Sequence, residues 1–296
     1  MIEFVNFYLI PGLVLGCIYA LGAIGISLTF GILRFANFAH GDTMTLGVYF
    51  TLSLVTLTGW HPLAVAPMAM ALTALAVLGM DQTFYKPFRR SPTIMLVIAS
   101  FGLMLMVRSV VQFFWGVQLQ VMVPGIARPW VLFDTLRILP KHVLIGAATV
   151  ALMLAMHLLL TRTRIGKAMR ATADSPELAA LTGIDTEAVI RATWITSAAL
   201  ATAAGVFLAL DTHVETMMGF KLLLPMFAAA ILGGIGKPYG AVVGGLVIGV
   251  AEEIATYPWI GTTPLLAPGY KAGVAFAIMV VMLVWRPQGL FRGRLR

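Results

Sequence analysis

Residues 175–183 read Ser175-Pro176-Glu177-Leu178-Ala179-Ala180-Leu181-Thr182-Gly183, inside a polar loop, 162–187, that separates two long apolar segments. Ser175 can accept a hydrogen bond from the free N–H groups of a first turn, and Pro176 suits the first helical position. Glu177 complements the helix dipole and Gly183 can close the C-terminus. The stretch predicts a short helix capped at both ends. A plain connection between two spans is the alternative.

The composition of the whole chain assigns it to the membrane. Of its 296 residues, 60% are hydrophobic and 11% are charged, and the mean hydropathy is +0.94. Soluble domains carry about twice that charged fraction. Residues 1–80 hold only Glu3, Arg34 and Asp42 as formal charges, too few for a solvated surface. We therefore expect an integral membrane protein.

Apolar segments separated by charges and by Pro or Gly breaks indicate where the helices cross the bilayer. A span needs roughly 20 apolar residues. The predicted spans are 9–33, 43–58, 63–80, 92–115, 142–160, 188–210, 222–236, 240–256 and 271–285. In the stretch 219–249, glycines and Pro238 either break one span or separate two. The expected fold is all-α, a polytopic transmembrane helix bundle of eight or nine spans with broken membrane helices. We expect a single transmembrane domain, 1–296, with a cytoplasmic loop at 162–187.

The positive charge predicts the orientation. Net charge is +8, which in a soluble protein would suggest nucleic acid as a partner. Here most of the basic residues form three clusters on one predicted side: Lys86, Arg89 and Arg90; Arg162, Arg164, Lys167, Arg170 and Arg191; and Arg286, Arg292, Arg294 and Arg296. The positive-inside rule makes that side cytoplasmic, with the C-terminus inside and the N-terminus outside. The loop 116–141 opposes this assignment, because it holds Arg128, Arg137 and Lys141 against Asp134.

Several kinds of site are missing from the sequence. Gly236-Lys237 is followed by Pro238, where a phosphate-binding loop needs Ser or Thr, so any ATPase must be another chain. No histidine pair has zinc spacing, and the single Cys17 excludes a disulfide framework within the chain. We expect no cofactor, no metal and no enzyme activity. His157, Glu252 and Glu253 are the clearest ionisable candidates for ion coupling.

Two segments predict breaks in membrane helices. The first is Leu28-Thr29-Phe30-Gly31-Ile32-Leu33-Arg34-Phe35-Ala36-Asn37-Phe38-Ala39-His40-Gly41-Asp42, directly followed by a new apolar run. Its free backbone groups must line a cavity or be buried in protein, and Asp42 or Asn37 could cap the next helix. The alternative is a tight surface turn with a solvated His40.

The second segment runs from Leu232 to Gly245 and is rich in glycine. The pairs Gly240 with Gly244 and Gly245 with Gly249 have the i, i+4 spacing that lets helix backbones approach closely. Close packing alone explains that spacing. A second broken element that echoes the first, as in internally repeated transporters, is the alternative.

Three stretches together resemble a known family. They are Tyr19-Ala20-Leu21-Gly22 through Asn37-Phe38-Ala39-His40-Gly41; Gly166-Lys167-Ala168-Met169-Arg170-Ala171 with residues 179–184; and Leu232-Gly233-Gly234-Ile235-Gly236 through Gly240-Ala241-Val242-Val243-Gly244-Gly245. In this combination and order the chain resembles permease subunits of bacterial branched-chain amino acid ABC importers. Its short N-terminus is similar to the LivH-type rather than the LivM-type.

The resemblance implies an assembly and a mechanism. Two related permeases form the pathway through the inner membrane, two ATPase subunits bind the coupling loops, and a periplasmic substrate-binding protein delivers the solute. It implies no nucleic acid. Residues for ATPase coupling would be Arg164, Gly166, Arg170, Ala171, Ser175, Pro176, Glu177 and Gly183. Residues of the substrate pathway would be Asn37, His40, Gly41, Gly233, Gly234 and Gly236.

Within that family the solute stays open between branched-chain amino acids, other hydrophobic amino acids, short amides and urea. A second copy of the chain could replace the related permease. A stand-alone ion-coupled secondary transporter is the rival from another class. An intramembrane enzyme is a third reading.

Overall fold

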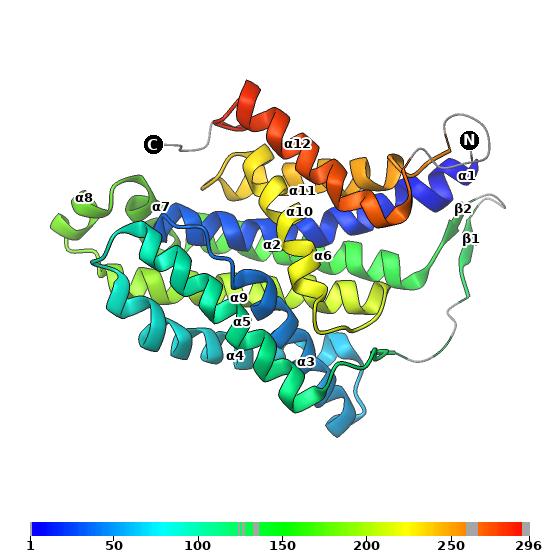
Figure 1. Ribbon diagram of the computed structural model, residues 1–296, viewed down its shortest axis with the longest axis horizontal. Helices are drawn as coiled ribbons and strands as arrows, with labels where there is room; N and C mark the ends of the chain where they lie inside the picture. Colours follow the sequence, from blue (N-terminus) through cyan, green and yellow to red (C-terminus); the bar gives the residue numbers. More distant parts are fainter. Residues whose placement is uncertain (1, 124, 126–127, 133–135, 259–265, 292–296) are drawn as a thin grey trace.

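A computed structural model describes residues 2–123, 125, 128–132, 136–258 and 266–291. Most of these residues are helical (Figure 1). The helices are α1 (Ile2–Phe4), η1 (Val5–Leu9), α2 (Ile10–Leu33), α3 (His40–Thr58), α4 (Pro62–Met80), η2 (Asp81–Tyr85), η3 (Lys86–Phe88), α5 (Thr93–Trp115), α6 (Pro140–Arg162), α7 (Arg164–Asp174), α8 (Pro176–Leu181), α9 (Thr186–Asp211), α10 (Met218–Gly233), α11 (Pro238–Ile254), η4 (Pro268–Tyr270) and α12 (Lys271–Trp285). Two short strands, β1 (Trp130–Leu132) and β2 (Leu136–Ile138), pair antiparallel.

Each predicted span coincides with one helix, which confirms the all-α bundle. By length and composition, five segments can cross a membrane: Val5–Leu33, Pro62–Phe88, Thr93–Trp115, Pro140–Arg162 and Thr186–Asp211. The helices α10 and α12 are apolar but shorter. The stretch 219–249 forms two helices, α10 and α11, so its glycines separate two elements rather than breaking one.

Proline and glycine set many of the helix boundaries. Proline occupies the first turn of α2, α4, α6, α8 and α11, where its missing N–H has no helical partner. Glycines with positive φ follow α3, α5 and α10, at Gly59, Gly116 and Gly234. Only glycine adopts that backbone conformation without strain. These positions were readable from the sequence.

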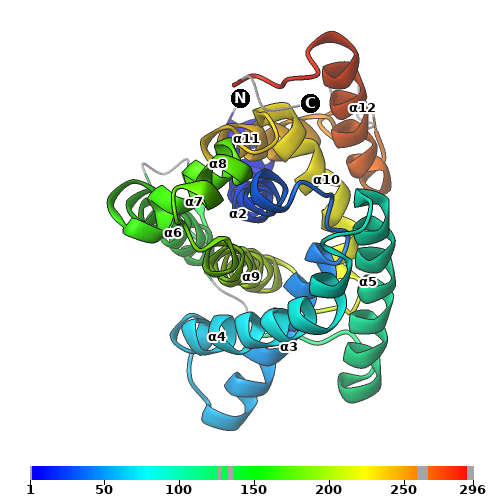
Figure 2. The ribbon, with the colours of Figure 1, turned by 90° about the vertical axis from the view of Figure 1, so that its left-hand side faces the viewer.

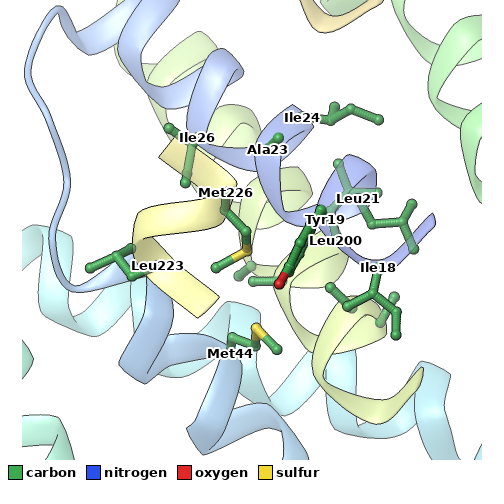
Figure 3. Packing of buried hydrophobic residues seen from close by; sticks show 14 of the residues in the cluster. Ile18, Tyr19, Leu21, Ala23, Ile24, Ile26, Met44, Leu200, Leu223 and Met226 are labelled. Carbon is green, nitrogen blue, oxygen red and sulfur yellow. The ribbon is translucent and has the colours of Figure 1, made fainter. Parts of the chain in front are cut away.

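The helix α2 forms the centre of the bundle. Figure 2 shows it enclosed by α6, α9, α10 and α11. Its residues Ile18 and Leu21 are fully buried, and they pack with Met44 of α3, Leu200 of α9 and Met226 of α10 (Figure 3). This central position explains why the first 33 residues contain almost no charge.

The first two basic clusters lie together at one end of the bundle. The helices α7 and α8 lie at the end opposite α1 and the β1–β2 hairpin (Figure 1). Arg89 pairs with Glu187, which brings the first basic cluster to the second. Phe291 donates its backbone N–H to Gly233, so the chain after α12 returns to the C-terminal end of α10. Asp134, Arg292, Arg294 and Arg296 lie outside the described residues. Which end is cytoplasmic stays a prediction.

Candidate functional site

The first break is a buried linker between α2 and α3. The helix α2 ends at Leu33, and Arg34 follows in the left-handed conformation with φ of 57°. The helix α3 begins at His40, with Ala39 at the N-cap position and no side chain capping it. The predicted cap by Asp42 or Asn37 is therefore wrong. Asn37 instead accepts a hydrogen bond from the Ala39 N–H, outside the helix, at 3.1 Å.

His40 is held inside the protein. Its side chain is 1% exposed, and Nε2 lies 3.1 Å from the Gly22 carbonyl oxygen of α2. Nδ1 lies 3.4 Å from the Ser197 hydroxyl of α9. Gly41 is equally packed, because a Cβ there would overlap the carbonyl of Gly219. The alternative of a solvated His40 in a surface turn is wrong, and the break is buried in protein.

Asp42 forms an ion pair that the sequence analysis missed. Arg108 of α5 donates to both carboxylate oxygens, from Nε at 3.1 Å and from an Nη at 2.9 Å. The Arg108 guanidinium also lies 4.4 Å from the centre of the Phe220 ring on α10. Arg108 is the only charged residue of α5. An ionisable group inside a span is the signal that could have found it.

The second break is a tight turn between α10 and α11. Gly234 and Gly236 have φ of 105° and 82°. A Cβ at Gly233 would overlap the carbonyl of Gly240 on the facing helix, so the two backbones are in contact there. Gly236 approaches Gly31 near the C-terminal end of α2. The glycines at this break act by allowing close packing, as their spacing predicted.

The structure does not gather the six proposed pathway residues into one cluster. His40 contacts α2 near Gly22, whereas Gly236 contacts it at Gly31. Those two positions on α2 are nine residues apart, which is about 14 Å at the rise of an α-helix. Asn37, Gly41, Gly233 and Gly234 are buried. The two breaks are therefore separate packing sites on the same central helix.

The predicted coupling loop forms a two-helix arm, α7 followed by α8. The helix α8 runs over Pro176–Leu181, and Gly183 has φ of 83° after its end, as the sequence predicted. Ser175 occupies the N-cap position, but its side chain makes no capping hydrogen bond, so that expectation is wrong. The first turn is held by the backbone instead, where the Ala179 N–H donates to the Ser175 carbonyl at 3.0 Å.

The arm is anchored through α7. A Cβ at Gly166 would overlap the carbonyl of Leu159, so the start of α7 lies directly against the end of α6. Thr163 caps α7 by accepting from the Gly166 N–H at 3.0 Å. Met169 is buried on the inner face of α7. The position of α7 is thereby fixed relative to the bundle.

The outer surface of the arm is mixed in character. Arg164, Arg170 and Glu177 are exposed, and Ala171 is half-buried. Leu178 and Leu181 of α8 are 63% and 83% exposed. An apolar pair flanked by charges, beyond the end of the bundle, is typical of a surface that contacts another protein.

The residues considered for ion coupling all have partners within the chain. Glu252 is buried and accepts from the Tyr19 hydroxyl at 2.6 Å, while both oxygens of Glu253 lie 2.7 Å from the Lys271 ammonium. His157 lies 2.9 Å from the Tyr239 hydroxyl. Within the part of the chain that the structure describes, no group of three His, Cys, Asp or Glu residues is placed to hold a metal ion.

Comparisons with known proteins agree with this architecture. The family described as "Branched-chain amino acid transport system / permease component" matches residues 8–283. The high-affinity branched-chain amino acid transport system permease protein LivH of Escherichia coli K12 is 31% identical over 94% of this chain and 92% of its own length. The corresponding permease BraD of Pseudomonas aeruginosa is 30% identical over 95% of this chain and 94% of its own length.

A solved structure shares the fold at low sequence identity. PsaBC from Streptococcus pneumoniae, in complex with a Fab, aligns with a TM-score of 0.53 and 13% identity over 94% of this chain and 91% of that chain. At this identity the likeness concerns the fold alone.

Proposed function

The chain belongs to the permease family of branched-chain amino acid transport systems, and we propose that it carries branched-chain or other hydrophobic amino acids across the bacterial inner membrane. It is a multi-pass membrane protein. Its relatives are named as transport permeases. Transport would be driven by separate ATPase subunits, because the chain has no phosphate-binding loop.

The structural observation that supports coupling to an ATPase is the exposed apolar pair on α8. Leu178 and Leu181 project from a short helix that is joined through α7 to α6 and α9. Burial of two leucines in a groove of an ATPase would contribute about 1.5–3 kcal/mol each. Arg164, Arg170 and Glu177 would set the register by pairing with charges on that subunit.

Movement of the arm would pass to the bundle through packed contacts. Because Gly166 touches Leu159 and Met169 is buried, α7 cannot shift without displacing the end of α6 or the start of α9. Close-packed elements move as rigid bodies. Ser175, Pro176, Ala171 and Gly183 would serve by shaping the arm rather than by touching the ATPase.

The proposed partners are two ATPase subunits, a second related permease and a periplasmic substrate-binding protein. Membership of the permease family supports this assembly. The dense basic clusters beside α7 and α8 support a cytoplasmic location for that end and for the C-terminus. A different chain as the second permease is preferred over a second copy of this one.

For the solute pathway we retain the two breaks. Asn37, His40 and Gly41 fix where α3 begins, and Gly233, Gly234 and Gly236 fix where α10 ends. Broken helices of this kind can turn relative to the bundle during alternating access. We expect these six residues to act by positioning helix ends, because most of their surface is buried in the same chain.

The test is purification of the tagged chain from its native membrane, with identification of the proteins that accompany it. We expect ATPases and a second permease, and ATP-dependent uptake of leucine by the reconstituted complex once the binding protein is added. Competition with urea and short amides distinguishes the other solutes. Uptake by the chain alone, without ATP but with an ion gradient, would refute the importer.

Variants of α8 test the arm directly. Leu178→Asp with Leu181→Asp should remove the ATPases from the purified complex and leave the second permease. The matched control is Leu57→Asp at the opposite end, since Leu57 is 82% exposed and Leu181 is 83% exposed. Retention of the ATPases by the double leucine variant would exclude α8 as the contact.

Replacing Arg170 and Glu177 together should reduce uptake and leave membrane insertion intact.

A further inference from the structure

Arg89 connects two helices at the end of the bundle that carries the arm. It follows η3 and precedes α5, and its side chain is 15% exposed. One Nη donates to Glu187 Oε1 at 2.6 Å, and the other donates to the Asp81 carboxylate. Glu187 belongs to the first turn of α9, shortly after the arm, and Asp81 follows the end of α4.

The Arg89 guanidinium stays charged in this position. Burial lowers its pKa, but the hydrogen bonds to Asp81 and Glu187 raise it by more, so the pKa lies above the ordinary arginine value. A planar guanidinium can hold two carboxylates at once, which an ammonium group does less well. The contact is therefore a two-sided ionic connection.

The same short segment reaches the first break. Tyr85, four residues before Arg89, donates its hydroxyl proton to Asn37 Oδ1 at 2.9 Å. Its ring stacks on Trp194 of α9, with centroids 5.0 Å apart and an angle of 17° between the planes. It also meets Phe35 of the linker, with centroids 5.4 Å apart. Residues 81–89 thus contact the start of α9 on one side and the linker 34–39 on the other.

This contact region has room and unsatisfied groups. A cavity of about 160 Å³ lies beside Arg89 and Tyr85, bounded also by Leu33, Phe35 and Ile190. Among the described residues, Arg89 Nε and Asp81 Oδ1 are buried without a hydrogen-bond partner. Buried polar groups without a partner are rare in native interiors, and the cavity beside Arg89 is large enough for its side chain to move.

We propose that Arg89 is a positioning residue for transport: it ties the start of α9, and with it the α7–α8 arm, to the linker of the first break. Displacement of the arm pulls on Glu187, and Arg89 with Tyr85 transmits that displacement to Asn37 and to the start of α3. The inference rests on the proposed function, because it presumes that an ATPase moves the arm.

An exposed ion pair of the same cluster is the natural contrast. Lys86 also approaches Glu187, at 3.8 Å, but its side chain is 57% exposed. Exposed pairs are worth little because water screens them and the side chains lose entropy. Only the Arg89 contact is expected to transmit movement.

The experiment compares Glu187→Gln with Lys86→Gln in the reconstituted complex, by the amount of leucine taken up per ATP hydrolysed. Glu187→Gln removes the negative charge that Arg89 pairs with on α9, which leaves at most a neutral hydrogen bond there, and keeps the pair of Arg89 with Asp81. We expect uptake per ATP to fall about tenfold, within the roughly 5–150-fold range of allosteric couplings. Lys86→Gln should leave the ratio unchanged.

Arg89→Lys supplies a second variant, which keeps the charge and loses the two-sided geometry. It should also lower uptake per ATP, even if the Glu187→Gln complex does not assemble. The proposal would be overturned if Arg89→Lys leaves the uptake per ATP hydrolysed unchanged. It would also be overturned if both variants lower uptake and ATP hydrolysis by the same factor. If the unaltered complex shows no ATP-dependent uptake, the proposed function itself fails, which is a different result.

Discussion

The two breaks of the membrane helices maintain their shape by opposite means. At the first, between α2 and α3, polar side chains satisfy the freed backbone and each other: Asn37, His40 and Asp42 all have partners on other helices. At the second, between α10 and α11, the contact is made by residues that have no side chain, and Gly233 meets Gly240 backbone to backbone. Irregular backbone within a bilayer can therefore be buried by adding hydrogen bonds or by removing volume.

The difference predicts different sensitivities. Apart from Gly41, which packs against the Gly219 carbonyl, the hydrogen-bonded break should be most sensitive to a charge or a donor that is left unpaired. A glycine break should tolerate changes of polarity nearby and fail when volume is added. Three substitutions test this contrast, from the largest expected effect to the smallest.

Gly233→Leu should have the largest effect. A Cβ at this position overlaps the Gly240 carbonyl, and no rotamer change relieves a collision with backbone. We expect this variant not to fold, because ordinary overpacking already costs about 1–3 kcal/mol and here the collision is with backbone. Size-exclusion chromatography in detergent should show aggregated protein. Gly146→Leu on α6 is the control, since a Cβ there has no neighbour within 4 Å. Equal behaviour of the two variants would disprove the steric account.

Arg108→Ala should come next, because it leaves Asp42 charged and buried. Breaking a buried pair from one side costs about 3–5 kcal/mol. Thermal unfolding in detergent measures the loss. The double variant Asp42→Asn with Arg108→Gln should recover more than half of the stability that Arg108→Ala loses.

The control for this pair is Lys221→Ala. Lys221 pairs with Glu215 at 2.5 Å, but its side chain is 60% exposed. Its removal should cost less than about 1 kcal/mol. If Arg108→Ala is no worse than Lys221→Ala, the ion pair does not hold the first break.

Tyr85→Phe should have the smallest effect. It removes one donor from Asn37, which keeps its hydrogen bond from the Ala39 N–H. The expected cost is about 1 kcal/mol. Asn37→Ala should cost more, since it removes the acceptor of both bonds. A double-mutant cycle that gives additive effects for Tyr85 and Asn37 would show that the hydroxyl bond contributes nothing.

The sequence predicted the elements of this fold better than their connections. Prolines and glycines marked the starts and ends of most helices, and the spacing of Gly240, Gly244, Gly245 and Gly249 correctly predicted close helix contact. The cap of α3 was wrong, because Asp42 is used by Arg108, a residue 66 positions away in the chain. Local propensity cannot reveal a partner that distant.

The same limit applies to the arm. Pro176 and Gly183 predicted the bounds of α8, since both act through their own backbone conformation. Ser175 was expected to cap the helix with its side chain and does not. The connection from Glu187 through Arg89 to Asp81 had no local signal, since its three charges come from separate elements.

By itself the sequence determined that this chain is a membrane-spanning helical bundle, where its helices begin and end, and which family it resembles. Those properties depend on composition, on periodicity and on the backbone preferences of proline and glycine, all of which act over a few residues. Only the tertiary structure decided that His40 lies between α2 and α9, that Arg108 neutralises Asp42, and that the two breaks are separate sites. These contacts join residues far apart in the chain, and burial in a low-dielectric interior is what makes them necessary.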